Sequence, residues 1–370
     1  MSHALVVGAG VAGLATAWGL VKRGWTVTVL EKGEIPNPTA ASCDHHRLTR
    51  WHYGDHIGYA ARMGLAFEAW DRLWHDLGVC HYVETGVFAV STEEGDWADT
   101  SCRAMDKLGL PHERISAADA VARFPNLNPD LAARFVSYTP TGGALMANRI
   151  LEGLRDWLAA KGAEIRTGTE VAELDAEAGA VITASGERLT ADTVVIAAGV
   201  GAPALGFPGA PDLVPTTSTI VYVEPPEDLA DAWQDAPSWV DFGGFDDLWG
   251  IAPVEGLPPK LGLGRLSVPG DPETGRVATE ERVQEIIAAY RGMFRDIDRF
   301  TVRSAQTNFY TTAPENRFVL RRAGKAVLLS ADSGHGFKFG ALSGYEAAEA
   351  MDEPGRFDII AERMAGHFAG

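Results

Sequence analysis

The sequence predicts an α/β fold of two domains, in which the first domain is assembled from segments far apart in the chain. Three observations support this prediction. A glycine-rich turn joins a strand to a helix near the N-terminus, and two later stretches repeat the order of strand and glycine loop. The length of 370 residues also exceeds the usual range of one domain. A second domain with a mixed sheet is expected between these pieces.

The composition is that of an ordinary globular protein, with 46% hydrophobic and 22% charged residues. A formal net charge of −18 argues against nucleic acid or an anionic membrane as a partner, because both require a cationic surface. Cys43, Cys80 and Cys102 are widely spaced, which fits a reducing compartment and suggests neither a disulfide framework nor a metal site. The apolar N-terminal run is punctuated by glycines and has no basic segment ahead of it, so we expect a cytoplasmic protein.

The first thirty residues read as strand, glycine turn, helix and strand. Residues 4–7 are strand-like, and residues 11–23 have helical periodicity. Gly24 ends the helix, and residues 26–30 form the second strand, which is followed by Glu31. This order is typical of the start of a dinucleotide-binding domain.

Gly8, Gly10 and Gly13 give the pattern G-x-G-x-x-G within this unit. Gly8 makes the tight turn, Gly10 lets the backbone approach a pyrophosphate, and Gly13 lets the helix pack closely on the strand. The N–H groups at the helix start bind the phosphates, and Glu31 stands where an acid accepts hydrogen bonds from a ribose. We therefore predict a Rossmann-like domain that binds an adenine dinucleotide, and the acid at position 31 disfavours a 2′-phosphate.

Two later segments favour FAD over NAD. Residues 192–205 read as an apolar strand followed by small residues and a helix, and residues 325–330 read as a strand before a glycine loop and a helix from about residue 340. Both strands are expected to return to the N-terminal sheet. A separate NAD domain does not need such returns, whereas several segments must hold the ring system of FAD. An NAD-linked dehydrogenase remains an alternative.

Five segments in order resemble the monomeric sarcosine oxidase and N-methyltryptophan oxidase group of the D-amino-acid-oxidase-like flavoproteins. They are VVGAGVAGLATAWGL, HHRLTRWHYGD, PPKLGLG, NFYTTAPENRFVL and SGHGFKF, and they extend over almost the whole chain. The resemblance implies a two-domain FAD enzyme that removes a hydride equivalent from the C–N bond of a small amino acid. In oxidase members the electrons then pass to oxygen and give peroxide. A small amino acid or amine and molecular oxygen are thus the expected partners, and the oligomeric state stays open.

The resemblance assigns three cations to the reaction. Arg50 matches the arginine, and Lys338 the lysine, that meet the substrate carboxylate, to which a guanidinium offers two parallel donors. Lys260 matches the lysine beneath the flavin, where a positive charge stabilises superoxide as it forms. The alternatives are an ion pair of Arg50 with Asp44 or Asp55, a contact of Arg50 with a flavin phosphate, and a surface position for Lys260.

The cofactor contacts follow from the fingerprint and the resemblance together. They are Gly8, Gly10, Val11, Ala12, Gly13, Glu31, Lys32, His46, Arg47, Val171, Ala198, Gly199, Gly334, Gly336, Phe337 and Lys338. One departure concerns the attachment of the flavin, because Asn308 stands where the group has its flavin-linking cysteine and no cysteine follows residue 102. We therefore predict noncovalent FAD, with His45 or His46 as the alternative attachment site.

The second departure concerns the substrate pocket. Gly264 stands in place of a pocket histidine and Trp249 in place of a tyrosine, while Tyr310 matches the tyrosine of the family's YT pair. Alternation along the strand puts Lys260, Gly262 and Gly264 on one face and predicts a hollow beside the lysine. Such a pocket suits a bulky, aromatic or cyclic secondary amino acid better than sarcosine. The alternative for Trp249 is a place in the domain core.

The predicted domain plan assigns residues 1–84, 140–215 and 318–370 to the FAD-binding domain and residues 85–139 and 216–317 to the substrate domain. The predicted function is FAD-dependent oxidation of a small secondary or N-methylated amino acid, with oxygen as the electron acceptor. The alternatives are a dehydrogenase of the same fold with another acceptor and a catalytically silent flavin-fold binding component. In the substrate domain, residues 278–294 read as an amphipathic helix with Thr279 as its N-cap.

Overall fold

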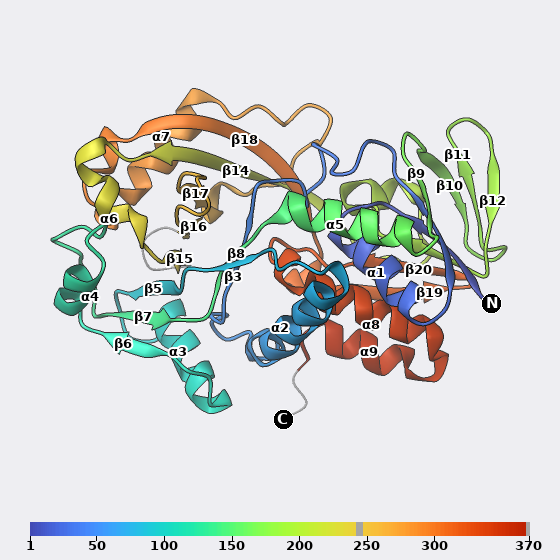
Figure 1. Cartoon of the computed structure of the whole chain (residues 1–370), viewed down its shortest axis with the longest axis horizontal. Coiled ribbons are helices and arrows are strands. Elements are labelled where there is room, and N and C mark those ends of the chain that lie inside the picture. The colour runs from blue at the N-terminus through green and yellow to red at the C-terminus, as the bar shows by residue number, and fades with distance from the viewer. Residues whose placement is uncertain (242–246, 368–370) are drawn as a thin grey trace.

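The computed structural model describes residues 1–241 and 247–367, and its two main sheets occupy different halves of the molecule (Figure 1). The smaller of these sheets contains six strands in the order β19 (Val319–Ala323), β20 (Ala326–Ser330), β13 (Thr193–Ile196), β1 (His3–Val7), β2 (Thr26–Leu30) and β9 (Glu164–Arg166). Strand β13 pairs with β1 and strand β20 pairs with β13, both in parallel. The two expected returns of the chain to the N-terminal sheet are thus confirmed.

Helix α1 (Val11–Lys22) begins at the predicted residue and ends one residue before the predicted end. It packs against α8 (Gly340–Asp352) at a distance that only small residues permit. A Cβ at Gly19 would lie 2.7 Å from the Cβ of Ala348, and a Cβ at Gly344 would lie 2.4 Å from the backbone of Ala15. This close packing holds both helices on one face of the six-stranded sheet (Figure 1). Val11, at the start of α1, and Lys338, just before α8, line the same cavity.

The larger sheet contains eight strands and carries the second half of the site. Its order is β18 (Thr301–Thr312), β14 (Val214–Glu224), β17 (Lys260–Leu263), β16 (Leu248–Ile251), β15 (Ser238–Asp241), β5 (Val87–Ser91), β7 (Phe135–Thr139) and β6 (Glu113–Ile115). The long strands β14 and β18 lie side by side and curve towards the six-stranded sheet (Figure 1). They bring residues 308–310 to a cavity that is also lined by the glycine turn after β1.

Helix α7 (Glu280–Ala289) packs on this sheet, and the Thr279 side chain caps it as predicted, by accepting a hydrogen bond from the Arg282 N–H. The helix is shorter than the predicted span of residues 278–294, because the chain tightens into a 3-10 turn over Tyr290–Gly292, which ends at a glycine. Met293 and Phe294, which follow the helix, are buried in the core. One expectation was wrong: the helix predicted after β13 is a short 3-10 helix over Gly199–Leu205. This stretch contains two glycines and Pro203, which lacks the N–H needed to continue an α-helix.

The remaining elements complete the two halves. Two small sheets contain β3 (Arg47–Thr49), β8 (Gly143–Leu145) and β4 (Tyr82–Glu84), and β10 (Val171–Asp175), β11 (Ala180–Thr183) and β12 (Arg188–Thr190). The other helices are α2 (Ile57–Leu77), α3 (Trp97–Leu108), α4 (Ala117–Arg123), α5 (Ala147–Ala160), α6 (Ala230–Gln234) and α9 (Phe357–Met364).

The predicted domain boundaries remain a prediction. The segments 216–317 and 318–370 include residues 242–246 and 368–370, which lie outside the described residues. Across residues 1–241 and 247–367, no helix combines the length and the apolar character required to cross a membrane.

Candidate functional site

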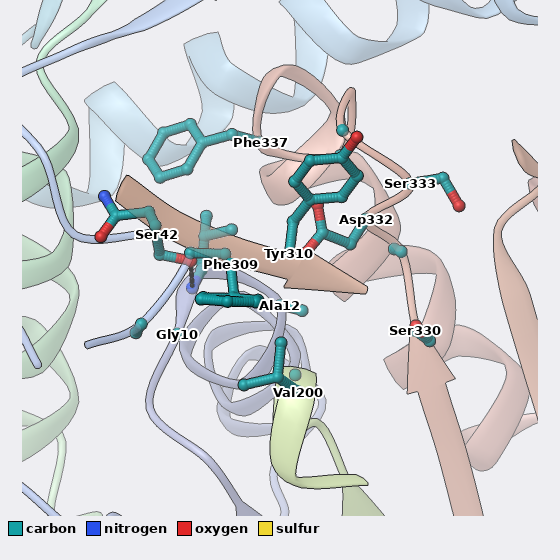
Figure 2. A pocket seen from close by; sticks show the side chains of 18 of the residues that line it. Gly10, Ala12, Ser42, Val200, Phe309, Tyr310, Ser330, Asp332, Ser333 and Phe337 are labelled. Atoms are coloured by element: carbon teal, nitrogen blue, oxygen red, sulfur yellow. Dashed lines mark hydrogen bonds between the residues drawn. The ribbon is translucent and has the colours of Figure 1, made fainter. Parts of the chain in front are cut away.

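The turn between β1 and α1 has the geometry expected of a phosphate-binding turn. Gly8 has a φ of +102°, in the region that favours glycine. A Cβ at Gly13 would lie 1.9 Å from the Gly8 carbonyl oxygen, so α1 can start against the turn only because position 13 has no side chain. Ser42 accepts a hydrogen bond from the Val11 N–H at 3.0 Å (Figure 2). The N–H groups at a helix start of this kind can bind an anion.

Glu31 lies directly after β2, and its carboxylate faces the same turn. It accepts hydrogen bonds from the backbone N–H groups of Ala9 at 2.8 Å and Gly33 at 3.0 Å, and from the side-chain amide of Asn37 at 2.8 Å. A carboxylate can accept about four hydrogen bonds. Glu31 is therefore fixed at the cavity wall and retains capacity for a hydroxyl group of a ligand.

A cavity of about 1380 Å³ extends from this turn to the eight-stranded sheet. In Figure 2, Phe337, Tyr310 and Asp332 lie on one side of it, and Gly10 and Val200 lie on the other. The predicted site residues that line this cavity are Gly8, Gly10, Val11, Ala12, Glu31, Lys32, Arg47, Arg50, Val171, Ala198, Gly199, Trp249, Lys260, Gly264, Tyr310, Gly334, Gly336, Phe337 and Lys338. The structure thus brings segments from residue 8 to residue 338 around one space.

Two of the predicted site residues do not line the cavity. Gly13 packs against the carbonyl of Gly8 instead. The ring of His46 is fully buried beside the ring of Tyr222, at 5.8 Å between centroids. Burial and the charge of Lys260 lower the pKa of His46 to about 2, so its imidazole is neutral at physiological pH. His46 contributes its backbone carbonyl to the site rather than its ring.

Lys260, at the start of β17, is fully buried and does not occupy a surface position. Its Nζ donates to Asp44 Oδ2 at 2.8 Å and to the His46 carbonyl at 2.7 Å. Burial lowers the pKa of Lys260 to about 8, against the opposing effect of Asp44. The ammonium therefore stands in the cavity wall with a carboxylate partner behind it.

The hollow predicted beside Lys260 is filled in part by Trp249. Strands β16 and β17 pair so that Trp249 stands opposite Gly262, and a Cβ at Gly262 would lie 2.2 Å from the indole ring. Trp249 is neither buried core nor surface, because its ring packs on Gly262 and lines the cavity. Gly264 lines the cavity one residue beyond the end of β17. At this end of the cavity the indole ring covers Gly262, whereas Gly264 belongs to the lining.

Arg50 and Lys338 meet around one aromatic ring. The guanidinium carbon of Arg50 lies 4.4 Å, and the Nζ of Lys338 5.9 Å, from the centre of the Tyr53 ring. Each of the two cationic residues is only 6% exposed, and both line the cavity. Arg50 also lies 5.3 Å from the ring of Trp97. Two buried cations on a shared aromatic wall form a site for an anion.

The charge of Lys338 has little compensation from the protein. Its Nζ donates to the His335 carbonyl at 3.1 Å, and within the described part of the chain no carboxylate forms an ion pair with it. Burial lowers the pKa of Lys338 well below its ordinary value, the charge of Arg50 lowers it further, and Asp332 opposes both. Burial in turn raises the pKa of Asp332 to about 6. A bound carboxylate would supply the missing counter-charge.

Several site residues were missed by sequence reasoning, among them Tyr53 and Ser42, described above, and Asp44, Asp332 and Tyr222. Asp44 was considered only as a partner of Arg50, yet it binds Lys260 and Arg47, and Tyr222 donates to it at 2.7 Å. Asp332 follows β20 immediately before the glycine loop. Asp44 and Asp332 could have been found, because each acid stands next to a motif that was predicted to carry a cation. Tyr222 could not, because nothing in the sequence distinguishes it from the other strand residues around it. Among residues 1–241 and 247–367, no cluster of three or more His, Cys, Asp or Glu side chains is arranged to hold a metal ion.

Comparison with protein families gives a match over nearly the whole chain. The family described as DAO, FAD dependent oxidoreductase, matches residues 3–350. The peroxisomal sarcosine oxidase of Mus musculus is 24% identical over 98% of this chain and 95% of its own length. The monomeric sarcosine oxidase of Streptomyces avermitilis is 25% identical over 90% of this chain and 89% of its own.

Solved structures with the same fold include L-proline dehydrogenase from P. horikoshii, with a TM-score of 0.82 at 20% identity over 97% of this chain and 98% of that one. The open form of NikD, an unusual amino acid oxidase, has a TM-score of 0.79 at 24% identity over 96% and 95% of the two chains. At these identities the likeness concerns the fold, and it agrees with the predicted α/β architecture of two domains.

Proposed function

Because the chain belongs to the DAO family of FAD-dependent oxidoreductases, we propose that it oxidises the C–N bond of a secondary or N-methylated amino acid. The curated relatives named sarcosine oxidase support this reaction class. The observation that carries the proposal is the pair of buried cations, Arg50 and Lys338, which both lie close to the Tyr53 ring.

The residues present fit a bound FAD. The β1–α1 turn leaves room for a pyrophosphate, Glu31 has acceptor capacity for a ribose, and a volume of about 1380 Å³ exceeds what a small amino acid alone requires. Bound FAD supplies the two-electron acceptor for the oxidation of the amine. Noncovalent attachment is proposed because Asn308 lines the cavity, whereas Cys43, Cys80 and Cys102 are absent from its described lining.

The substrate carboxylate is held by Arg50 and Lys338. Arg50 can offer two parallel donors, and Lys338 adds a point charge that has no ion-pair partner within the described residues. With the carboxylate fixed at this wall, the amine and its neighbouring C–H extend towards the middle of the cavity. Holding the substrate in this orientation lowers the entropic cost of bringing the C–H bond to the flavin.

The size of the substrate follows from the other side chains that line the cavity. Gly264 contributes no side chain there, and Tyr53, Tyr59, Trp97 and Trp249 present aromatic surface to the same cavity. Aromatic walls favour flat apolar groups. We therefore propose a substrate larger than sarcosine, with an aromatic or cyclic side chain.

Lys260 assists the second half-reaction. As a buried ammonium in the cavity wall, it can stabilise the negative charge that develops when oxygen accepts an electron. The imine product is hydrolysed by water. Oxygen as acceptor is the part of the proposal that separates an oxidase from a dehydrogenase of the same fold.

One anaerobic experiment tests the reaction class. Cyclic, N-alkyl and aromatic amino acids are mixed with the holoenzyme, and loss of the visible flavin band identifies a substrate. Arg50→Lys should raise KM by about 10-fold or more because the bidentate fork is lost. Failure of every amino acid to bleach the flavin would contradict the proposal. After acid precipitation, noncovalent FAD leaves a yellow supernatant and a colourless pellet.

A further inference from the structure

We propose that Asp44 is a positioning residue that holds Lys260 as a cation with one N–H directed to the cavity. Asp44 lies in the loop before β3, 216 positions from the lysine in the sequence, and nothing in the local sequence links the two. The inference rests on the proposed function in so far as Lys260 assists the reaction with oxygen. The contacts that carry it are independent of the substrate.

The Asp44 carboxylate is buried and fully occupied. Oδ1 accepts hydrogen bonds from the Tyr222 hydroxyl and the His45 N–H, both at 2.7 Å. Oδ2 accepts from Lys260 at 2.8 Å and from Arg47 Nη1. Four donors match the four acceptor sites of a carboxylate. Asp44 is therefore held in one orientation and cannot turn to bind a ligand itself.

Lys260 is correspondingly restricted. An ammonium has three N–H donors, and two of them are used by Asp44 and the His46 carbonyl. The rings of Tyr222 and Trp249 lie 5.9 Å and 5.7 Å from Nζ and limit its movement. Since Lys260 lines the cavity, the third N–H is the donor left for a ligand or for oxygen.

The charges around Nζ explain why this carboxylate is needed. His46 is neutral, Tyr222 is a phenol whose pKa burial raises further, and Arg47 repels a second positive charge. Asp44 is the negative group of this set, and Lys260 and Arg47 keep its pKa well below the ordinary value against the cost of burial. Without Asp44, burial and Arg47 would both favour the neutral amine at position 260.

The test uses the holoenzyme without any amino-acid substrate. The flavin of the wild type, Asp44→Asn, Lys260→Met and the double variant is reduced chemically under nitrogen and mixed with oxygenated buffer between pH 6 and pH 9. We expect Asp44→Asn to slow reoxidation at least 10-fold at pH 8 and less at pH 6, where Lys260 regains its proton. In the Lys260→Met background the same change should alter the rate by less than 2-fold.

Two results would overturn the inference: an Asp44→Asn rate equal to that of the wild type at every pH, or an equal slowing in both backgrounds. Thermal melting in excess FAD provides a second readout. Asp44→Asn should lower the melting temperature less in the Lys260→Met background than in the wild type. Equal losses would count against the inference.

Recovery of folded protein is also decisive. If Asp44→Asn cannot be recovered but the double variant can, the unpaired lysine is the cause and the inference is supported. If neither can be recovered, Asp44 supports the fold independently and the inference fails. Because the flavin is reduced chemically, these outcomes are separate from any failure to find an amino-acid substrate.

Discussion

Replacement of Lys338 by methionine should lower activity and raise stability at the same time. The side chain is 6% exposed, its Nζ has one hydrogen bond to the His335 carbonyl, and within the described residues it has no ion pair. Methionine preserves most of the apolar stem and removes the charge. The same substitution removes one contact to the substrate carboxylate, so the two effects have opposite signs.

The magnitude follows from the contacts. A hydrogen bond to a charged group contributes roughly 1.5–3 kcal/mol, which predicts a loss of about 10- to 150-fold in kcat/KM. Removal of a poorly compensated buried charge should raise the free energy of unfolding by several kcal/mol, and loss of the hydrogen bond to the His335 carbonyl should lower it by about 1 kcal/mol. We expect a net gain of about 2 kcal/mol at pH 7. With an unfolding entropy of about 2.1 cal/mol/K per residue, this gain raises the melting temperature by about 2–3 °C.

The pH dependence provides an independent check. Because the folded-state pKa of Lys338 is below its unfolded value, the unfolded chain binds more protons in the interval up to about pH 10.4. The free energy of unfolding of the wild type should therefore rise with pH through this interval. Lys338→Met removes this rise, and the two melting curves should converge as the pH approaches 10.

Lys260→Met is the matched control, because it removes a lysine that is buried but paired. There the substitution leaves the Asp44 carboxylate buried without one of its charged donors, which should destabilise the protein by about 2 kcal/mol. Scanning calorimetry of full-length protein with saturating FAD measures both variants. The reasoning is refuted if Lys338→Met melts at or below the wild-type temperature, or if both variants shift in the same direction.

Two further changes test other parts of the site. Gly13→Val should lower the affinity for FAD at least 10-fold, because a Cβ at this position would stand 1.9 Å from the Gly8 carbonyl oxygen. Flavin fluorescence in the filtrate after ultrafiltration measures the FAD that is lost. Normal retention of FAD would contradict the assigned turn geometry. Asp332→Asn should change how stability depends on pH. The folded-state pKa of about 6 exceeds the ordinary value, so Asp332 stabilises the wild type below about pH 4 and this contribution is lost as the pH rises through 6. The variant should lack this fall in melting temperature, and an unchanged fall would assign it to another group.

The sequence was sufficient for the elements whose cause is local. The glycine spacing predicted the start of α1, and Thr279 before an acidic turn predicted the start of α7. Apolar strands with flanking glycines predicted that β13 and β20 would join the first sheet. The residues that determine where α1 and α7 begin lie within a few positions of each helix.

The charge arrangement could not be predicted in this way. The Asp44–Lys260 pair depends on how a loop of one half meets a strand of the other, and the place of Trp249 depends on the register of β16 and β17. Alternation alone predicted an open face along Gly262 and Gly264, but an aromatic ring from the neighbouring strand covers the first glycine. Cross-strand neighbours, rather than positions in one strand, determine which part of a pocket stays open.

The net charge of −18 says little about the ligand, and the site explains why. Most acidic side chains face water, where charges are screened within about 8–10 Å. Arg50 and Lys338 lie instead in a buried wall of low local dielectric constant, both close to the Tyr53 ring, so their field in the cavity is weakened far less. If this is the origin of anion binding, added salt up to 0.5 M should change the KM for the amino acid by less than about 3-fold. If KM depended on salt concentration as steeply as surface ion pairs do, the substrate carboxylate would bind at an exposed site and not at Arg50 and Lys338.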